Sequence, residues 1–154
     1  MTLPKTYELI VTEKPRVSQR IAQSLAEGKM QTKKEGRVSY YILKHSGKDI
    51  VIAPAVGHVF TLKKIKRKSG YPVFDIHWIE SYIASRGAFY TKPYIDVLKM
   101  LAKDAKSFVS ATDYDIEGEL IGYNVLKYIC GEEALKKARR MKFSALTKEE
   151  LVKA

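Results

Sequence analysis

Residues 112–119 read Thr112-Asp113-Tyr114-Asp115-Ile116-Glu117-Gly118-Glu119 and hold four carboxylates in eight positions. The preceding run, 107–112, is rich in β-forming residues and is typical of a buried strand. After the acidic stretch, apolar residues recur at helical spacing from 116 to 129, and Gly131 follows as a stop. The acidic stretch therefore marks the point where a buried strand passes into a helix.

The beginning of the chain repeats this arrangement. Residues 7–12 predict a buried strand, Glu13-Lys14-Pro15 a tight turn, and residues 15–25 an amphipathic helix that stops near Gly28. Strand–helix units at both ends predict an α/β domain, with a Rossmann-like, mainly parallel sheet flanked by helices. Such sheets place their sites at the carboxyl ends of strands, which selects Glu13-Lys14 and Asp113 onward.

The rest of the chain adds strands and helices around these two units. Residues 29–80 are interpreted as a β-rich, basic insertion. The elements expected outside the two units are a hairpin of 38–44 and 49–53, an extended segment 71–78, a helix over 90–103, a short strand 139–143, and a final helix opened by a capping box at 147–150.

Length and composition exclude several classes of protein. The chain has 154 residues, enough for one domain, and a single cysteine, Cys130, which excludes an internal disulfide framework. No apolar run approaches the ~18 residues of a membrane span, and Met1–Lys5 is too short and polar for a signal peptide. We expect a cytoplasmic, nucleoid-associated protein without membrane contact.

The net charge of +11 is concentrated in one part of the chain. Residues 29–68 hold 11 basic and two acidic residues, a net charge of +9. The densest cluster is predicted to contact the phosphates of a nucleic acid, although a solubilising surface would have the same composition. Its residues are Lys63, Lys64, Lys66, Arg67 and Lys68.

Alternate carboxylates point to a metal. In extended backbone Asp113, Asp115 and Glu117 share a face, and three carboxylates in one small site repel each other unless a cation neutralises them or some take up protons. Oxygen ligands favour Mg²⁺. The alternative for Glu117 and Glu119 is that they only complement the helix dipole at the start of the helix. An EF-hand calcium loop is excluded because its twelfth position is Asn124 rather than glutamate.

At this point the sequence resembles a known family. Glu13 after one strand and the 113–119 acidic stretch after another resemble the Toprim domain. Four motifs in order, covering nearly the whole chain, resemble the start of type IA DNA topoisomerases, closest to archaeal topoisomerase I and topoisomerase III. These motifs are Thr12-Glu13-Lys14-Pro15, Gly57-His58-Val59, the run 111–121, and the run 140–147.

The resemblance implies an isomerase that relaxes negatively supercoiled DNA by Mg²⁺-dependent, ATP-independent single-strand cleavage, strand passage and religation. It implies that the three alternate carboxylates hold Mg²⁺ and that Glu13 acts as a general acid and base at the scissile 3′ oxygen. It also implies that Lys14 and Arg140 contact phosphate near the cleavage site and that His58 contacts DNA.

The family's nucleophilic tyrosine has no counterpart here. None of the 10 tyrosines stands in the family's nucleophile motif, and Tyr114 is interpreted as a packing residue. Residues 1–154 are therefore expected to be the Toprim domain of a larger, monomeric polypeptide whose other domains are absent from this chain. Alone, the fragment is expected to be inactive on DNA.

Other functions stay open at this point. A freestanding Toprim nuclease or primase-like protein and a non-catalytic, basic nucleic-acid-binding module are both compatible with the residues. Reverse gyrase shares the fold. The number of Mg²⁺ ions, the DNA sequence preference and the role of Cys130 do not follow from the sequence.

Overall fold

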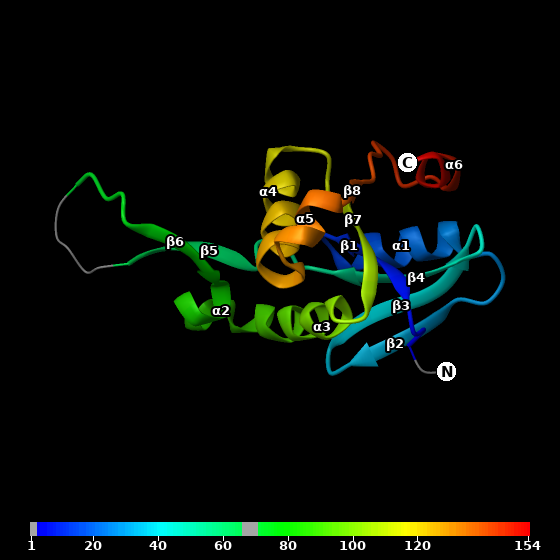
Figure 1. The fold of residues 1–154 in the computed structure, drawn as a ribbon, viewed down its shortest axis with the longest axis horizontal. Coiled ribbons are helices and arrows are strands. Elements are labelled where there is room, and N and C mark those ends of the chain that lie inside the picture. Colours follow the sequence, from blue (N-terminus) through cyan, green and yellow to red (C-terminus); the bar gives the residue numbers. More distant parts are fainter. Residues whose placement is uncertain (1–2, 66–70) are drawn as a thin grey trace.

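The computed structural model describes residues 3–65 and 71–154 and has two sheets flanked by helices (Figure 1). The main sheet has six strands in the order β2-β3-β4-β1-β7-β8, and a small sheet pairs β5 with β6. The strands are β1 Tyr7–Thr12, β2 Gln31–Glu35, β3 Val38–His45, β4 Lys48–Pro54, β5 Phe60–Lys64, β6 Ile76–Glu80, β7 Ala105–Ala111 and β8 Arg139–Arg140. The helices are α1 Pro15–Leu25, α2 Ser81–Ala84, the 3₁₀ helix η1 Arg86–Thr91, α3 Lys92–Ala102, α4 Ile116–Val125, the π-helix η2 Leu126–Cys130, α5 Glu132–Lys137 and α6 Lys148–Lys153.

The centre of the main sheet is parallel, as predicted. Strand β1 lies between β4 and β7, and Thr12 aligns with Pro54 on one side and Ala111 on the other. Strand β8 continues the parallel part, whereas β2 and β3 are antiparallel at the far edge. The carboxyl ends of three parallel strands therefore meet at one edge, where Glu13 and Asp113 begin their loops.

Two apolar layers enclose the sheet. All six residues of β1 are buried, and their side chains alternate between the layers. Leu9 and Val11 pack with Leu98 of α3 and Ile121 of α4 on one face. Ile10 packs on the other face with the buried residues of α1 and α6. A strand that is covered on both faces is rich in apolar and β-forming residues, and only Glu8 and Thr12 of β1 are polar, which is why the sequence predicted β1 correctly.

Residues 29–80 divide between the two sheets. Strands β2, β3 and β4 complete the main sheet, and β5 and β6 form a hairpin that projects away from it (Figure 1). The sequence missed β2, because its Gln-Thr-Lys-Lys-Glu run forms an edge strand with little apolar surface. Strand β5 was missed because its exposed lysines interrupt the apolar pattern that would indicate a strand. Lys66, Arg67 and Lys68 lie outside the described residues.

The remaining predictions differ from the structure mainly at element ends. The expected helix 90–103 is η1 followed by α3, and the expected helix 116–129 continues from α4 into η2 before Gly131, whose φ is 101°. The strand expected over 139–143 pairs at only two residues. Within the described ranges 3–65 and 71–154, no helix is long and apolar enough to cross a membrane.

Candidate active site

The two predicted loops meet at the carboxyl edge of the sheet. Glu13 follows β1 and Asp113 follows β7, and Lys14 lies between their carboxylates. The Lys14 Nζ is 3.1 Å from Glu13 Oε1 and donates a 2.6 Å hydrogen bond to Asp113 Oδ2. The Glu13 side chain is only 12% exposed. The hydrogen bonds from Lys14 to Asp113 and Glu13 raise the pKa of the lysine, so it stays charged at neutral pH.

The loop that follows β4 supports Glu13 from the other side. The Gly57 amide donates a 2.9 Å hydrogen bond to the Glu13 carbonyl oxygen. Gly57 has a φ of 75° and its predecessor Val56 a φ of 63°, so the turn is left-handed at two successive residues. His58 comes next and is exposed, and its carbonyl accepts from Ser81. The predicted Gly-His turn is therefore beside the site, whereas contact of His58 with DNA stays a prediction.

The three carboxylates predicted to hold Mg²⁺ do not gather into one cluster in the described structure, and their binding of Mg²⁺ stays a prediction. Among the described residues, no three histidine, cysteine, aspartate or glutamate side chains form a group that could hold a metal. Asp115 caps α4, accepting a 2.7 Å hydrogen bond from the Gly118 amide, and Glu117 is exposed in the first turn. Alternate residues share a face only in extended backbone, and the helix already begins at Ile116.

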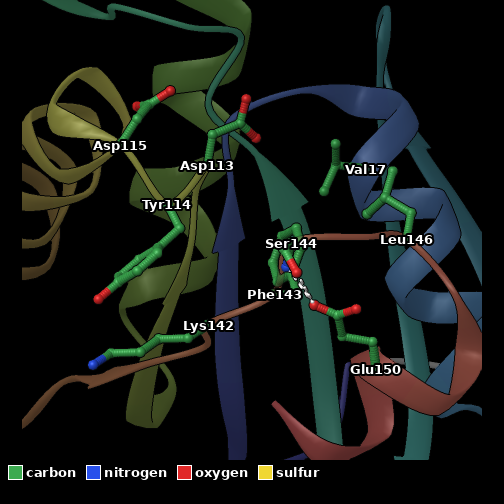
Figure 2. Close-up of a pocket in the computed structure, with 9 residues that line it drawn as sticks. All are labelled: Val17, Asp113, Tyr114, Asp115, Lys142, Phe143, Ser144, Leu146 and Glu150. Atoms are coloured by element: carbon green, nitrogen blue, oxygen red, sulfur yellow. Dashed lines mark hydrogen bonds between the residues drawn. The ribbon is translucent and has the colours of Figure 1, made fainter.

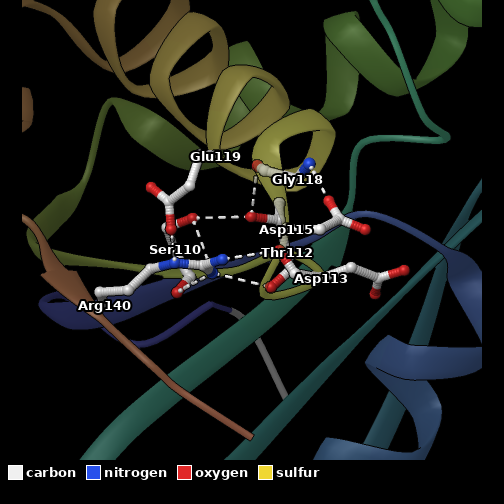
Figure 3. A network of polar contacts seen from close by, with 7 residues as sticks. All are labelled: Ser110, Thr112, Asp113, Asp115, Gly118, Glu119 and Arg140. Carbon is white, nitrogen blue, oxygen red and sulfur yellow. Dashed lines mark hydrogen bonds and ion pairs between the residues drawn. The ribbon is translucent and has the colours of Figure 1, made fainter. Parts of the chain in front are cut away.

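Arg140 lies underneath the acidic loop rather than facing outward (Figure 3). Its guanidinium donates to the carbonyl oxygens of Thr112 and Asp113, both at 2.7 Å, and to Ser110 at 3.2 Å. Its Nε donates at 2.6 Å to Glu119, which the sequence suggested was only a helix-start charge. The side chain is 16% exposed. Arg140 therefore braces the backbone of the loop, and its predicted phosphate contact stays a prediction.

A pocket of about 610 Å³ opens beside the acidic loop (Figure 2). Tyr114 forms part of its wall and is 62% exposed, which differs from the packing role expected for it. Lys142 Nζ lies 5.4 Å from the Tyr114 ring centroid, and the Arg140 guanidinium lies 5.8 Å from it. The pocket is lined by Val17, Asp113, Tyr114, Asp115, Lys142, Phe143, Ser144, Leu146 and Glu150.

The chemistry of the donor set fits Mg²⁺. Glu13 and Asp113 offer carboxylate oxygens, the ligands that Mg²⁺ prefers. Both carboxylates already contact a cation, the Lys14 ammonium, so the local charge favours a positive group there. One oxygen of Asp115 is used by its cap to Gly118. The residues at hand for a metal are thus Glu13, Asp113 and Asp115, with Glu117 on the adjoining turn.

Sequence reasoning missed the parts that hold the loop in shape. The Thr112 hydroxyl donates a 2.6 Å hydrogen bond to the Gly118 carbonyl oxygen. A Cβ on Gly118 would lie 2.0 Å from the Asp113 carbonyl oxygen, so only glycine fits. A glycine inside an acidic run was a signal that could have indicated close backbone approach. The remaining predicted residues, Lys63 and Lys64, lie on the projecting hairpin, and Lys66, Arg67 and Lys68 fall outside the described part of the chain.

Comparison with known proteins gives a consistent picture. A family model described as the Toprim domain matches residues 8–146. DNA topoisomerase 1 of Methanocaldococcus jannaschii is 52% identical over 148 residues, covering 95% of this chain and 19% of that protein. DNA topoisomerase 1 of Pyrococcus furiosus is 48% identical over 146 residues, covering 95% and 14%. The corresponding protein of Methanothermobacter thermautotrophicus is 43% identical over 150 residues, covering 97% and 21%. The chain spans about a fifth or less of these relatives.

Proposed function

This chain belongs to the Toprim domain family, and we propose that it is the Toprim domain of a type IA DNA topoisomerase of the archaeal kind. The whole enzyme relaxes negatively supercoiled DNA by Mg²⁺-dependent, ATP-independent cleavage, passage and religation of one strand. Other domains of the same polypeptide supply the nucleophilic tyrosine. This chain supplies the metal-binding carboxylates and a general acid and base.

One observation carries this proposal: Glu13 and Asp113, which are 100 positions apart in the sequence, both contact the Lys14 ammonium at the carboxyl edge of adjacent parallel strands. A carboxyl group placed against a reacting oxygen can give a proton to that oxygen or take one from it. That is the property required of a group that protonates a departing oxygen and later removes the same proton.

The residues of the chain divide the work as follows. Asp113 and Asp115 would hold Mg²⁺ together with Glu117, and bound Mg²⁺ would neutralise charge on the carboxylates and on a DNA phosphate. Glu13 moves the proton at the 3′ oxygen. Lys14 sits beside Glu13 and can offer its ammonium to a phosphate oxygen. Arg140 fixes the backbone on which Asp113 stands.

The metal assignment is tested by titrating Mg²⁺ into this chain and into the Asp113→Asn/Asp115→Asn variant. Asparagine is as good a helix cap as aspartate, so α4 should stay folded. We expect binding by the wild type and at least tenfold weaker binding by the variant. Asp96→Asn is the matched control, because Asp96 also contacts a lysine at 2.6 Å but on the exposed surface of α3. Equal Mg²⁺ binding by wild type and double variant would refute the site.

The catalytic assignment is tested in a chimera. This chain replaces the matching fifth of the Methanocaldococcus jannaschii relative, and relaxation of a negatively supercoiled plasmid is followed on gels. We expect Mg²⁺-dependent, ATP-independent relaxation that falls by about 10²-fold or more with Glu13→Gln, because the glutamine cannot exchange a proton. Glu149→Gln, an exposed change on α6, should relax DNA at the wild-type rate. Full activity of the Glu13→Gln chimera would exclude the proposed role of Glu13.

A further inference from the structure

The projecting hairpin carries apolar side chains that nothing in the described structure covers. We call it the arm and define it as residues 60–65 and 71–80. Tyr71 is 92% exposed and Phe74 is 82% exposed, and Leu62, Ile65 and Ile76 are each about half exposed or more. A two-stranded sheet that stands alone is only marginally stable in water. Exposed apolar groups gathered on such an element mark an interaction surface.

The arm also carries two exposed lysines beside its apolar side chains. Lys63 and Lys64 lie on β5 and are exposed. In the sequence, residues 60–80 contain five basic residues and two acidic residues, Asp75 and Glu80, and three of the basic residues lie outside the described part of the chain. The Lys64 Nζ lies 5.4 Å from the centroid of the Tyr71 ring, so cation and aromatic face are presented together.

This combination distinguishes between classes of partner. Protein interfaces are depleted of lysine, which makes a protein a poor match for the arm. Contacts of lysines with phosphates alone suit any duplex. Exposed aromatic rings interleaved with cations suit a strand whose bases are unstacked, because each base can stack on a ring while its phosphate contacts a lysine.

We propose that the arm binds unpaired DNA, stacking bases on Tyr71 and Phe74 while Lys63 and Lys64 contact the phosphates. The inference rests on the proposed function only for the identity of the nucleic acid. The arm projects away from the main sheet (Figure 1), so its contact is separate from the carboxylates of Glu13 and Asp113 and requires no metal.

The test measures the fluorescence anisotropy of a labelled dT20 oligonucleotide with the whole chain in EDTA. The Tyr71→Ala/Phe74→Ala variant should bind at least about tenfold more weakly, because stacking contributes that much per ring. The Tyr71→Trp/Phe74→Trp variant should retain wild-type affinity. Lys63→Gln/Lys64→Gln should flatten the dependence of affinity on salt. All these side chains are exposed, so the variants should fold, as circular dichroism will verify.

Tyr123→Ala is the matched control. Tyr123 is another exposed tyrosine with a lysine 5.4 Å from its ring centroid, but it lies on α4. It should bind dT20 as the wild type does. Wild-type affinity of the double alanine variant, or the same loss on a blunt 20-base-pair duplex, would overturn the proposal. So would a wild-type chain that does not bind dT20.

The arm and the metal site can fail separately. The Asp113→Asn/Asp115→Asn variant should bind dT20 in EDTA like the wild type. If the chain binds no Mg²⁺ but the alanine variant binds dT20 more weakly, the arm proposal stands and the metal assignment falls. If the Asp113→Asn/Asp115→Asn variant loses Mg²⁺ binding but the Tyr71→Ala/Phe74→Ala variant binds dT20 with wild-type affinity, only the arm proposal falls.

Discussion

Lys14 gives the site a positive charge of its own before any metal arrives. Its ammonium contacts Asp113, one of the carboxylates proposed to hold Mg²⁺, and Glu13, the proposed general acid and base. The positive charge of Lys14 therefore offsets the repulsion between the Glu13 and Asp113 carboxylates in the folded protein. A metal ion that binds these carboxylate oxygens has to compete with the Lys14 ammonium. Once displaced, the ammonium can form an ion pair with a phosphate.

Replacing Lys14 should strengthen Mg²⁺ binding to the isolated chain. We expect Lys14→Gln to tighten binding about three- to tenfold, since a charge that competes for the same oxygens is removed. Isothermal titration at low salt will measure it. Lys142→Gln removes a cation that contacts Tyr114 and no carboxylate of the site, so its effect should be smaller. Weaker Mg²⁺ binding by Lys14→Gln would show that the lysine does not compete.

Arg140 should be irreplaceable by lysine, although the charge is conserved. The planar guanidinium serves three backbone carbonyls and one carboxylate at once, and an ammonium cannot reach them all. Arg140→Lys should lower the free energy of unfolding by roughly 2–3 kcal/mol. The amide hydrogen of Gly118 should also exchange faster. Unchanged exchange at this amide, with Lys142→Gln as the control, would contradict the brace.

At the level of elements, the junction of β7 and α4 is the tightest part of the site. Strand β7 ends at Ala111 and α4 begins at Ile116. The loop between them is held because Asp115 caps the helix and the Thr112 hydroxyl bonds to Gly118 (Figure 3). Because both the amide and the carbonyl group of Gly118 are hydrogen-bonded, the first turn of the helix is fixed relative to the strand, and so are the acidic residues on it. The positions of Asp113 and Asp115 are thus set by the junction between strand and helix.

Gly118→Ala should disrupt this junction. The added Cβ would lie 2.0 Å from the Asp113 carbonyl oxygen, which is backbone and cannot move aside freely. We expect a loss of about 3 kcal/mol or more in urea unfolding, together with loss of Mg²⁺ binding. Gly87→Ala is the control, since its Cβ would meet only Ser85 Oγ at 3.6 Å. Equal stability of the two variants would count against the predicted clash.

The thiol in the π-helix η2 should be unreactive in the folded chain. Burial raises the pKa of Cys130 to about 12, against an ordinary value of 9.0. Iodoacetamide at pH 8 should label it slowly, and urea should speed labelling by orders of magnitude. The raised pKa also stabilises the fold below pH 9, and this contribution is lost as the pH rises from 9 toward 12. Rapid labelling of the native chain would contradict its burial.

At the scale of the whole molecule, the last helix, α6, packs against α1 and completes the apolar layer on that face of the sheet. Leu151 of α6 is 1% exposed and packs with Val17 and Ile21 of α1. The Arg20 side chain also donates a 2.8 Å hydrogen bond to the Leu146 carbonyl oxygen, joining residues 126 positions apart. The two ends of the described chain therefore stabilise each other, and together they form one wall of the pocket beside the acidic loop.

Truncating Leu151 should therefore destabilise the whole domain. Leu151→Ala should cost about 2–4 kcal/mol of unfolding free energy, through lost burial and the cavity that remains. The neighbouring Val152 is 47% exposed, so Val152→Ala should change stability by less than ~0.5 kcal/mol. Thermal unfolding followed by circular dichroism compares the two. Similar melting temperatures would mean that α6 is not part of the cooperative fold.

The sequence alone determined the fold class, the two strand–helix units and the residues Glu13 and Asp113. These features depend on local patterns, namely apolar runs, turn residues and acidic residues at strand ends. Each pattern lies within about ten consecutive residues of a single strand or helix. Edge strand β2 and strand β5 escaped because their exposed residues carry no such apolar pattern.

Only the tertiary structure decided how the site is held. Lys14 reaches Asp113 across 99 positions, and Arg140 reaches backbone carbonyls 27 to 30 positions away. No local pattern reports such contacts, because strand order in the sheet brings these residues together. Because the helix begins at Ile116, Asp113 contacts Lys14, whereas Asp115 caps the helix and Glu117 lies in its first turn. The types of residue follow from the sequence, and their partners follow from the parallel alignment of β1 and β7.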